Sequence, residues 1–408
     1  MRAEFERQSL SDGLVREPHR FGAEAHAIAF HAPSIGEEEI AAVTATLRSG
    51  WLTTGEQAFR LEEEFAGRLG ARHAVAVSSG TAALHLALRA AGVAPGDEVI
   101  VPTFTFTATA EAVLYLGARP VLADVDPRTG TLEPEEVAHR LGPRIRAVVP
   151  VHLGGLPCDL DRIGALAHGA DAVVIDDAAH ALPARLGGHL VGTLADATAF
   201  SFYATKNITS GEGGMVTTAR DDWAETMRLW RLHGLSRDAW RRYREDGSWA
   251  YEVVDLGCKY NLPDVLAAIG RAQLAKLDRF ATARRALVAC YREALADEEA
   301  VELPEEPAGR ESAWHLFAVR LCLEQLRIDR AGVIAELARR GIGTSVHFIP
   351  LHRHPYYRRT LAVEPAGFPG AEDLFRRCLS LPLYPALAPA DVDCVAQALR
   401  DVLGTHRR

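Results

Sequence analysis

Lys206 is the residue whose surroundings point most directly to covalent chemistry in this 408-residue sequence. It follows an apolar run at residues 199–203, typical of a strand, and precedes a glycine cluster at residues 211–214, where the backbone is expected to turn sharply. Because burial lowers the pKa of an ammonium group, an amine held at such a place can attack an aldehyde cofactor. A surface lysine at the end of a strand is the alternative.

Asp176 and Asp177 close an apolar run that begins at residue 172 and is typical of a buried parallel strand. Ligands of open α/β sheets bind at this carboxyl end of the strands. A carboxylate there could keep the nitrogen of a pyridine ring protonated, so that the ring takes up electrons. His180 could then donate a hydrogen bond to a ring hydroxyl. The alternatives are a helix cap for the aspartates and a place on a helix face for the histidine.

The stretch Ser79-Gly80-Thr81 lies between an expected strand and an alanine-rich helix. The free N–H groups of a helix N-terminus, a glycine and a neighbouring hydroxyl together suit a phosphate group, and an ordinary N-cap by Ser79 is the alternative. Phe106 follows another strand and could stack on a planar ring, although phenylalanine at such a place is commonly part of the core. With no G-x-G-x-x-G motif and no Walker lysine, the sequence does not indicate a dinucleotide or a nucleoside triphosphate.

Three histidines, His347, His352 and His354, are spaced as metal ligands can be, but no acids or cysteines accompany them at ligand spacing. We therefore expect a polar pocket wall there and no metal site. The six cysteines are scattered without a C-x-x-C pair, which favours reduced thiols over disulfides or zinc.

Short apolar runs alternate with segments of helical periodicity, which indicates βαβ units and a largely parallel sheet covered on both faces. Two helices are expected ahead of these units, the first with Ile40, Val43 and Leu47 on its apolar face. Strands are expected at residues 73–78, 98–102, 120–124, 147–151, 172–176 and 199–203, with helices at residues 81–91, 107–116, 134–141 and 160–168.

The last third of the chain has a different pattern. Strands at residues 314–322 and 344–348 flank a helix at residues 330–340, and a terminal amphipathic helix is expected at residues 392–403. The predicted parts are an N-terminal tail of residues 1–30 that could lie over a partner subunit, a large domain of residues 31–280 and a small α+β domain of residues 281–408.

Composition excludes several classes of function. The formal net charge of −9 and the pI near 6.0 argue against nucleic acid as a general partner, and the basic stretch at residues 237–244 is expected to be a solvated face or a contact to a small anion. No run approaches the roughly 18 apolar residues of a membrane span, and the first residues lack an apolar signal core. We expect a cytoplasmic protein with small-molecule substrates.

Eight ordered motifs together resemble one family, the PLP-dependent nucleotide-sugar aminotransferases of the DegT/StrS type, which have the fold-type I aminotransferase architecture. The resemblance covers about residues 31–405. The motifs are SGWLTTG (49–55), SGTAAL (79–84), GDEVIVP (96–102), PVH (150–152), DAAHA (177–181), SFYATKNITSGEGGM (201–215), RLHG (231–234) and GCKYNLPD (257–264).

The resemblance implies roles around the ring of pyridoxal 5'-phosphate (PLP). Lys206 would form the internal aldimine, and Asp177 would pair with the pyridine nitrogen. Phe106 would stack on the ring, and His180 would lie near the ring oxygen, where many relatives carry glutamine. Relatives with histidine in place of the lysine are sugar dehydratases, a branch that Lys206 argues against.

The resemblance also implies a phosphate site and a partner subunit. Gly80, Thr81 and Ser201 would hold the phosphate, and Asn261 would reach the phosphate of the neighbouring subunit. The active enzyme would then be a homodimer whose active sites are shared across the interface. Departures from the family pattern are the N-terminal extension, Pro183 in place of glycine and Phe348 where tyrosine is frequent; none of them falls on the residues named for the cofactor.

The expected function is transfer of an amino group, from glutamate, through PLP to the keto carbon of a nucleotide-linked sugar. Arg231, Arg237 and Arg241 are candidates for contacts to the diphosphate or to the carboxylate of the amino donor. Two alternatives stay open: the same chemistry on a keto-cyclitol or another small ketone, and a non-catalytic regulator with the same fold. A regulator would be expected to have lost residues such as Lys206 or Asp177, which are present.

Overall fold

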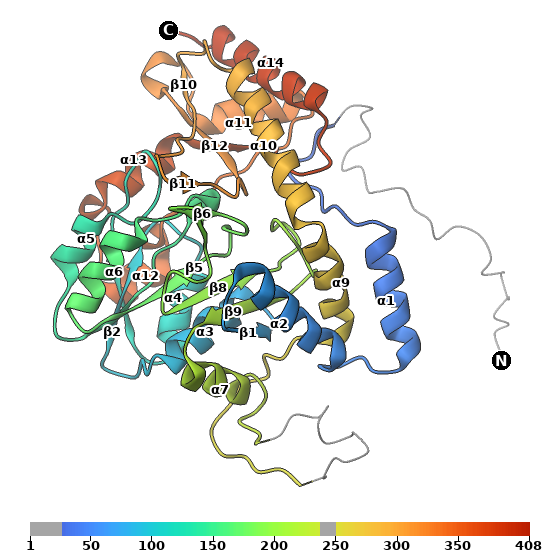
Figure 1. The fold of residues 1–408 in the computed structure, drawn as a ribbon. Helices are drawn as coiled ribbons and strands as arrows, with labels where there is room; N and C mark the ends of the chain where they lie inside the picture. Colours follow the sequence, from blue (N-terminus) through green and yellow to red (C-terminus); the bar gives the residue numbers. More distant parts are fainter. Residues whose placement is uncertain (1–26, 237–249) are drawn as a thin grey trace, which may run out of the picture.

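A seven-stranded sheet forms the centre of the larger part of the molecule (Figure 1). The structure is a computed structural model that describes residues 27–236 and 250–408. Most of the expected N-terminal tail, the basic stretch and the candidates Arg237 and Arg241 therefore lie outside the described residues. The strand order is β1-β9-β8-β5-β4-β2-β3, and β9 runs antiparallel to both of its neighbours while the other pairs are parallel. The strands are β1 (His73–Val77), β2 (Glu98–Pro102), β3 (Arg119–Ala123), β4 (Ile145–Val148), β5 (Val173–Asp177), β8 (Ala197–Ser201) and β9 (Gly214–Thr218).

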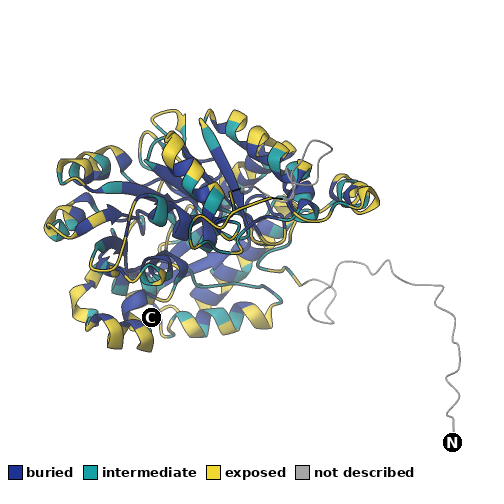
Figure 2. Ribbon diagram, turned by 90° about the horizontal axis from the view of Figure 1, so that it is seen from below, coloured by how far each residue is buried: buried dark blue, intermediate teal, exposed yellow. Residues whose placement is uncertain are grey.

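Both faces of this sheet are buried, as its nearly continuous apolar strands predict. In β1, Val75 and Val77 pack into one hydrophobic cluster, whereas Ala74 and Ala76 pack into another. Because successive side chains of a strand point to opposite faces, the two clusters lie on opposite sides of the sheet. Burial is greatest in the strands, and the exposed residues gather on the outer surfaces of the helices (Figure 2). The α/β class with a mostly parallel sheet is confirmed.

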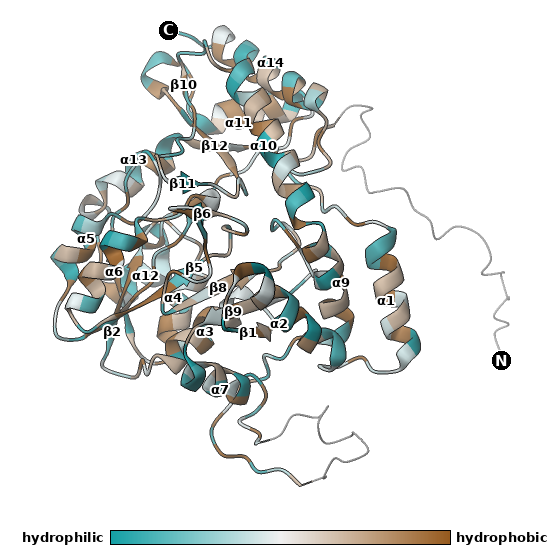
Figure 3. Cartoon of the chain, viewed as in Figure 1, coloured by the Kyte–Doolittle hydropathy of each residue, from teal (hydrophilic) through white to brown (hydrophobic). Residues whose placement is uncertain are grey.

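The helices divide between the two faces. Helices α3, α4 and α7 contribute to the cluster with Val75, and α2 contributes to the cluster with Ala74; α5 and α6 cover the strands near β4. Figure 3 shows hydrophobic strands beneath helices of mixed polarity. The helices of this part are α1 (Glu37–Ser49), α2 (Glu56–Leu69), α3 (Gly80–Ala90), α4 (Ala108–Tyr115), α5 (Pro134–Arg140), α6 (Leu160–Gly169), α7 (Asp221–Trp230) and α9 (Asp264–Ala275).

A smaller part follows along the chain, with its own cluster of buried apolar residues. Helix α10 (Leu277–Ala294) joins the two, since Phe280 packs with the larger part and Leu287 with the smaller one. Domain boundaries at residues 30 and 280 stay a prediction. The elements of the smaller part are β10 (Val301–Glu302), β12 (Phe317–Leu321), β13 (Cys378–Leu381), α11 (Arg330–Arg339) and α14 (Pro389–Thr405). Helices α12 (Pro355–Leu361) and α13 (Pro369–Arg377) follow α11 in the chain but pack their buried side chains into the cluster of the larger part. A short outer sheet joins β11 (Arg310–Glu311) to β6 (Arg185–Leu186) and β7 (His189–Leu190).

Two expected strands of the smaller part are wrong or shortened. Residues 344–348 form no strand, because the segment pairs with β13 only through the bridge between Ser345 and Ser380 and then turns away. The strand expected from residue 314 begins at Phe317, since Trp314 has a positive φ of 48°, which no strand residue adopts. The strand before Lys206 also ends early, at Ser201.

The apolar face expected for α1 lies largely outside the core of the single chain. Ile40 and Leu47 are 52% and 54% exposed, and the buried positions are Glu39 and Thr46. The buried side of α1 is polar because the Glu39 carboxylate accepts hydrogen bonds from Lys276 and Gln273, and this side therefore faces α9. An apolar stripe therefore lies on the surface of the single chain. None of the helices among the described residues combines the length and apolarity needed to cross a bilayer.

Candidate active site

Lys206 lies on the turn between β8 and β9, five residues beyond the end of β8, and is partly buried. Its backbone N–H donates to the Tyr203 carbonyl over 2.9 Å, and the side-chain amide of Asn207 donates to Leu182 and Ala313 carbonyls. Burial lowers the pKa of Lys206 to about 8, and the negative charge of Asp177 opposes part of that shift. At neutral pH a lysine with this pKa is neutral in about one molecule in ten, against fewer than about one in a thousand for a free lysine.

Asp177 is held at the carboxyl end of β5. Its backbone N–H donates to the Pro150 carbonyl, and its carboxylate accepts hydrogen bonds from Thr109 Oγ1 at 2.8 Å and from the Ala179 N–H at 3.2 Å. Burial raises the pKa of Asp177, and these two donors act against the increase. No helix follows β5 directly, since the next elements are β6 and β7. The alternative that the aspartates cap a helix is therefore wrong. The carboxylate is buried, has hydrogen-bond donors and lies near the one amine of the turn.

His180 lies in the turn after β5, not on a helix face. Its Nδ1 accepts a hydrogen bond from the Gly154 N–H at 3.2 Å, which leaves the ring proton on Nε2. Burial holds the pKa of His180 well below its usual range, and the charge of Lys206 acts in the same direction. The residue is thus a neutral imidazole with a fixed tautomer, able to donate one hydrogen bond.

Phe348 lies beside this imidazole and brings a second ring, that of Phe106, into the same neighbourhood. The ring of Phe348 lies 5.8 Å from that of His180 and 5.8 Å from that of Phe106, measured between centroids. Phe106 is 58% exposed, so the alternative that places it in the core is wrong. Its exposed ring can contact a planar ligand.

The start of α3 has both an ordinary N-cap and the free donors expected of a phosphate site. Ser79 caps the helix, because its hydroxyl accepts a hydrogen bond from the Ala82 N–H at 3.1 Å. The N–H groups of Gly80 and Thr81 have no hydrogen-bond partner in the part of the chain that the structure describes. A Cβ at Gly80 would lie 2.9 Å from Ser201 Cβ, closer than side-chain carbons approach. Glycine therefore brings two free N–H groups next to the Ser201 hydroxyl, which is a suitable set of donors for a phosphate.

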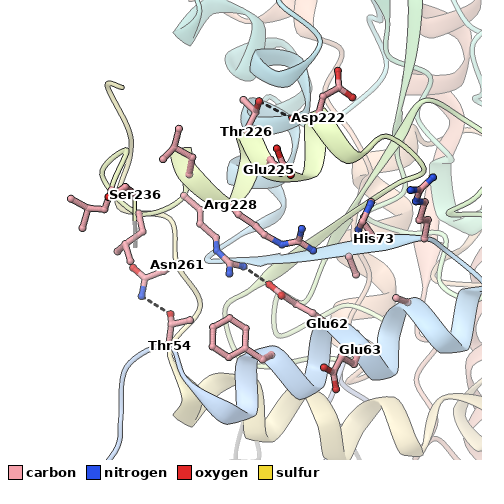
Figure 4. A pocket seen from close by; sticks show the side chains of 18 residues that line it. Thr54, Glu62, Glu63, His73, Asp222, Glu225, Thr226, Arg228, Ser236 and Asn261 are labelled. Atoms are coloured by element: carbon pink, nitrogen blue, oxygen red, sulfur yellow. Dashed lines mark hydrogen bonds and ion pairs between the residues drawn. The ribbon is translucent and has the colours of Figure 1, made fainter. Parts of the chain in front are cut away.

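A broad groove lies elsewhere, between α2, α7 and the start of β1 (Figure 4). Its volume is about 1010 Å³, and Asn261 lies at one end, where its amide donates to Thr54 Oγ1 at 2.8 Å. Arg231 also lines it, but this guanidinium is buried, pairs with Glu62 and donates to the Ala76 carbonyl at 2.9 Å. Both of these bonds come from Nη1, so the pairing with Glu62 uses part of the guanidinium, and a role of Arg231 toward a diphosphate or a carboxylate stays a prediction.

Sequence reasoning missed several residues near Lys206. His315 Nδ1 donates a hydrogen bond to Asn207 Oδ1 at 3.1 Å, and its ring centroid lies 4.3 Å from that of His180. His31 Nε2 lies 3.1 Å from the Ala204 carbonyl. Both come from segments more than 100 positions away from Lys206, so no local pattern marks them. Asn207 directly follows Lys206 in the sequence, which could have drawn attention to it, but its residue type alone indicates no particular role.

The three spaced histidines separate in the structure. His347 lies in the neighbourhood of Lys206, and its Nδ1 contacts Ser380 Oγ at 3.0 Å. His352 is buried and bonded to Thr103 Oγ1 and to Glu372, so it is structural. Among residues 27–236 and 250–408, no group of three histidine, cysteine or acidic side chains could hold a metal ion.

Comparison with known proteins agrees with this arrangement. The model of the DegT/DnrJ/EryC1/StrS aminotransferase family matches residues 33–400. The spore coat polysaccharide biosynthesis protein SpsC of Bacillus subtilis is 45% identical over 379 residues, 93% of this chain and 97% of that protein. The PMP form of a sugar aminotransferase from Streptococcus pneumoniae superposes with a TM-score of 0.87 at 32% identity, over 93% of this chain and 99% of that one.

DesV of S. venezuelae, solved with a ketimine intermediate, is also similar, with a TM-score of 0.83 at 36% identity over 90% of this chain and 94% of that chain. The expected fold-type I architecture is thereby confirmed, and so is the expected cofactor. The chain belongs to the DegT/DnrJ/EryC1/StrS aminotransferase family and is a PLP-dependent aminotransferase.

Proposed function

We propose that this enzyme transfers an amino group from glutamate to the keto carbon of a nucleotide-linked sugar. The observation that carries the proposal is a low-pKa amine, Lys206, within the electrostatic reach of the buried carboxylate of Asp177 at the end of the sheet. The similar proteins support the sugar: SpsC is named for polysaccharide biosynthesis, and PseC of Helicobacter pylori is an aminotransferase of pseudoaminic acid biosynthesis with a TM-score of 0.87, at 26% identity over 93% of this chain and all of that one.

The residues fit PLP in three independent respects. Gly80 leaves room for an anion beside Ser201, where a Cβ would clash. Asp177 offers a buried carboxylate whose two donors favour its charged form. Phe106 offers an exposed ring. When bound, PLP supplies an aldehyde that condenses with amines and a ring that takes up an electron pair.

The chain's own groups would then divide the work. Lys206 would act as the amine that holds the cofactor and, once displaced, as the base that moves a proton at the substrate carbon. Asp177, ionised beside a protonated ring nitrogen, would keep that nitrogen charged. His180 would donate its Nε2–H to the ring oxygen, since its Nδ1 is already occupied by the Gly154 N–H. Gly80, Thr81 and Ser201 would hold the phosphate.

A homodimer is part of the proposal. The exposed apolar stripe of α1, with Ile40 and Leu47, continues at each end of the helix into the exposed side chains of Ile35 and Leu52. Burying such a stripe against a second copy removes it from water. Asn261, at the end of the groove in Figure 4, would then serve the phosphate site of the neighbouring subunit. A cytoplasmic location stays a prediction.

The function is tested with purified protein, PLP, glutamate and a panel of nucleotide-linked keto sugars. We expect formation of the amino sugar and of 2-oxoglutarate in equal amounts, with ping-pong kinetics. Borohydride should fix PLP to Lys206, as read by peptide mass, and Lys206→Ala should abolish both results while Lys259→Ala, at an exposed position, should change neither. A wild-type protein that takes up no PLP would contradict the proposal.

The shared site has its own test, by mixing two inactive variants. A Lys206→Ala subunit and an Asn261→Ala subunit are mixed to form hybrid dimers. If Asn261 serves the partner's site, one of the two sites of each hybrid contains both Lys206 and Asn261; otherwise neither site does. Random mixing makes half of the dimers hybrids with one intact site in two, so recovery of about a quarter of wild-type activity is expected. No recovery would mean that Asn261 acts within its own subunit.

A keto-cyclitol acceptor is the main alternative for the substrate. The same assay separates the two, because amination of a keto-cyclitol with no amination of any keto sugar nucleotide would replace the sugar in the proposal. A non-catalytic role is not favoured, since Lys206, Asp177 and Ser201 are all present.

A further inference from the structure

The segment of residues 27–32, just ahead of α1, is bound to the smaller part of the molecule. The Ile28 N–H donates to the Gly341 carbonyl at 2.8 Å, and the Gly343 N–H donates to the Ile28 carbonyl at 2.8 Å. A Cβ at Gly343 would lie 2.6 Å from the Phe30 nitrogen, so glycine is required for this close approach. The Phe30 ring stacks on His347 at 5.4 Å. The segment is therefore a packed part of the fold.

The next side chain of this segment reaches the lysine turn. His31 Nε2 lies 3.1 Å from the carbonyl oxygen of Ala204, two positions before Lys206. The imidazole also meets the ring of Tyr384 edge-on, with centroids 6.2 Å apart, and Tyr384 follows β13 in the smaller part. One imidazole thus joins the turn of the larger part to the smaller part.

The direction of the hydrogen bond between His31 and Ala204 is set by its acceptor. A carbonyl oxygen only accepts, so Nε2 must carry the proton. Burial lowers the pKa of His31 to about 4, and the positive charges of Arg284 and Lys206 act in the same direction. The ring is therefore neutral, with its proton on Nε2, at every pH above about 5, and the hydrogen bond persists throughout that range.

The turn needs an anchor at this point. After Lys206 the chain is fixed by Asn207, whose amide donates to two carbonyls. Ahead of Lys206, Tyr203 is 47% exposed, and the described residues supply His31 as the donor to Ala204. Without the imidazole, the Ala204 carbonyl would lose its hydrogen-bond partner in a partly buried place, which costs about the free energy that a typical hydrogen bond contributes.

We propose that His31 is a positioning residue, which acts through the Ala204 carbonyl to fix the backbone from which the Lys206 amine operates. The inference rests on the proposed role of Lys206. In each half-reaction that amine must leave and return to one place, and a displacement of about 1 Å in such a group can lower the rate about 100-fold. The segment of residues 27–32 thereby couples the placement of the smaller part to the placement of the amine.

The test compares His31→Phe, which keeps a ring against Tyr384 but has no donor, with His31→Gln, which keeps an N–H. The readout is hydrogen exchange of the amides at residues 203–207 in the cofactor-free protein, together with the pH at which Lys206 reacts half-maximally with an amine reagent. His31→Phe should speed exchange about tenfold and shift this midpoint, and His31→Gln should restore most of both. His168→Phe, at an exposed histidine on α6, is the control.

Unchanged exchange and an unchanged midpoint in His31→Phe would overturn the proposal. Equal loosening by both variants would overturn it as well, because packing alone would then explain the effect. Both readouts use the cofactor-free chain, so they do not depend on amino transfer. If Lys206→Ala kept its activity, the proposed function would fail while the exchange result would still decide whether His31 holds the turn.

Discussion

The Thr109 hydroxyl donates a 2.8 Å hydrogen bond to Asp177 Oδ2, and it also lies 2.9 Å from Thr105 Oγ1. Both threonines are buried, Thr109 in the first turn of α4 and Thr105 in the segment ahead of it, so the charge of Asp177 is stabilised inside the protein by a short chain of hydroxyls. This relation counteracts the effect of burial, which raises the pKa of Asp177.

Removing the Thr109 hydroxyl is therefore expected to weaken catalysis. Thr109→Val keeps the shape and deletes the donor, which raises the pKa of Asp177 further. A hydrogen bond to a charged group contributes about 1.5–3 kcal/mol, so kcat/KM should fall about tenfold to 100-fold. Thr109→Ser should restore most of the activity, and Thr226→Val on α7 should have little effect. An unchanged kcat/KM in Thr109→Val would show that the hydroxyl does not support the carboxylate.

Gly80→Ala tests the phosphate site. The added methyl group would lie 2.9 Å from Ser201 Cβ, so the start of α3 must shift away from Ser201. We expect the Kd for PLP, measured by fluorescence titration, to rise at least about tenfold with the fold intact by circular dichroism. Gly67→Ala is the matched control, because nothing lies within 4 Å of a Cβ there; inside α2 it should stabilise the protein by about 0.5–1 kcal/mol. Equal PLP affinity in the two variants would argue against the site.

The lowered pKa of Lys206 predicts a cost in stability. Its pKa is about 8 in the folded protein and about 10.5 in the unfolded chain, so protonation favours unfolding. The cost is complete below pH 8, at about 3 kcal/mol, and disappears as the pH rises from 8 to above 10.5. Lys206→Met should therefore stabilise the cofactor-free protein at pH 7, and by less than half as much at pH 9.5. Urea unfolding at both pH values, at one protein concentration, measures this. A gain that is the same at both pH values would mean that the charge is not its cause.

The apolar stripe of α1 predicts the effect of a charge placed on it. Ile40→Glu should convert the dimer to a monomer in analytical ultracentrifugation and abolish amino transfer with it, because a carboxylate cannot be buried without a partner. Ala45→Glu, an exposed change on the same helix away from Ile40 and Leu47, should leave the dimer intact. A dimer that survives Ile40→Glu would place the interface elsewhere.

Much of the larger part follows from local patterns, because most of its strands are apolar runs and its helices are periodic; β9, with the sequence GMVTT, is not among the expected strands. β2 coincides with its expected bounds, and the expected strand before Asp177 differs from β5 by one position. The motifs at residues 49–55 and 257–264 also have a physical basis: the Asp264 carboxylate accepts hydrogen bonds from the Gly55 and Ala58 N–H groups at 2.7 and 3.0 Å.

What the sequence could not provide depends on contacts between distant segments. Arg231 is a residue type that binds anions, and only the structure shows that its Nη1 already pairs with Glu62. The outward face of α1 depends on Lys276, more than 200 positions away. His31 and His315 reach the lysine turn by tertiary packing, so neither could be assigned from the residues around it.

Arg284 gives two of the histidines around Lys206, His31 and His315, a common property. Its guanidinium is buried, donates to the carbonyls of Trp314, His315 and Leu383, and has no carboxylate partner among residues 27–236 and 250–408. Burial lowers the pKa of both His31 and His315, and this uncompensated positive charge acts in the same direction on each ring. Both rings are therefore neutral near pH 7, where they act as permanent dipoles and not as a buffer. Changes of activity with pH near neutrality would then not arise from these two histidines.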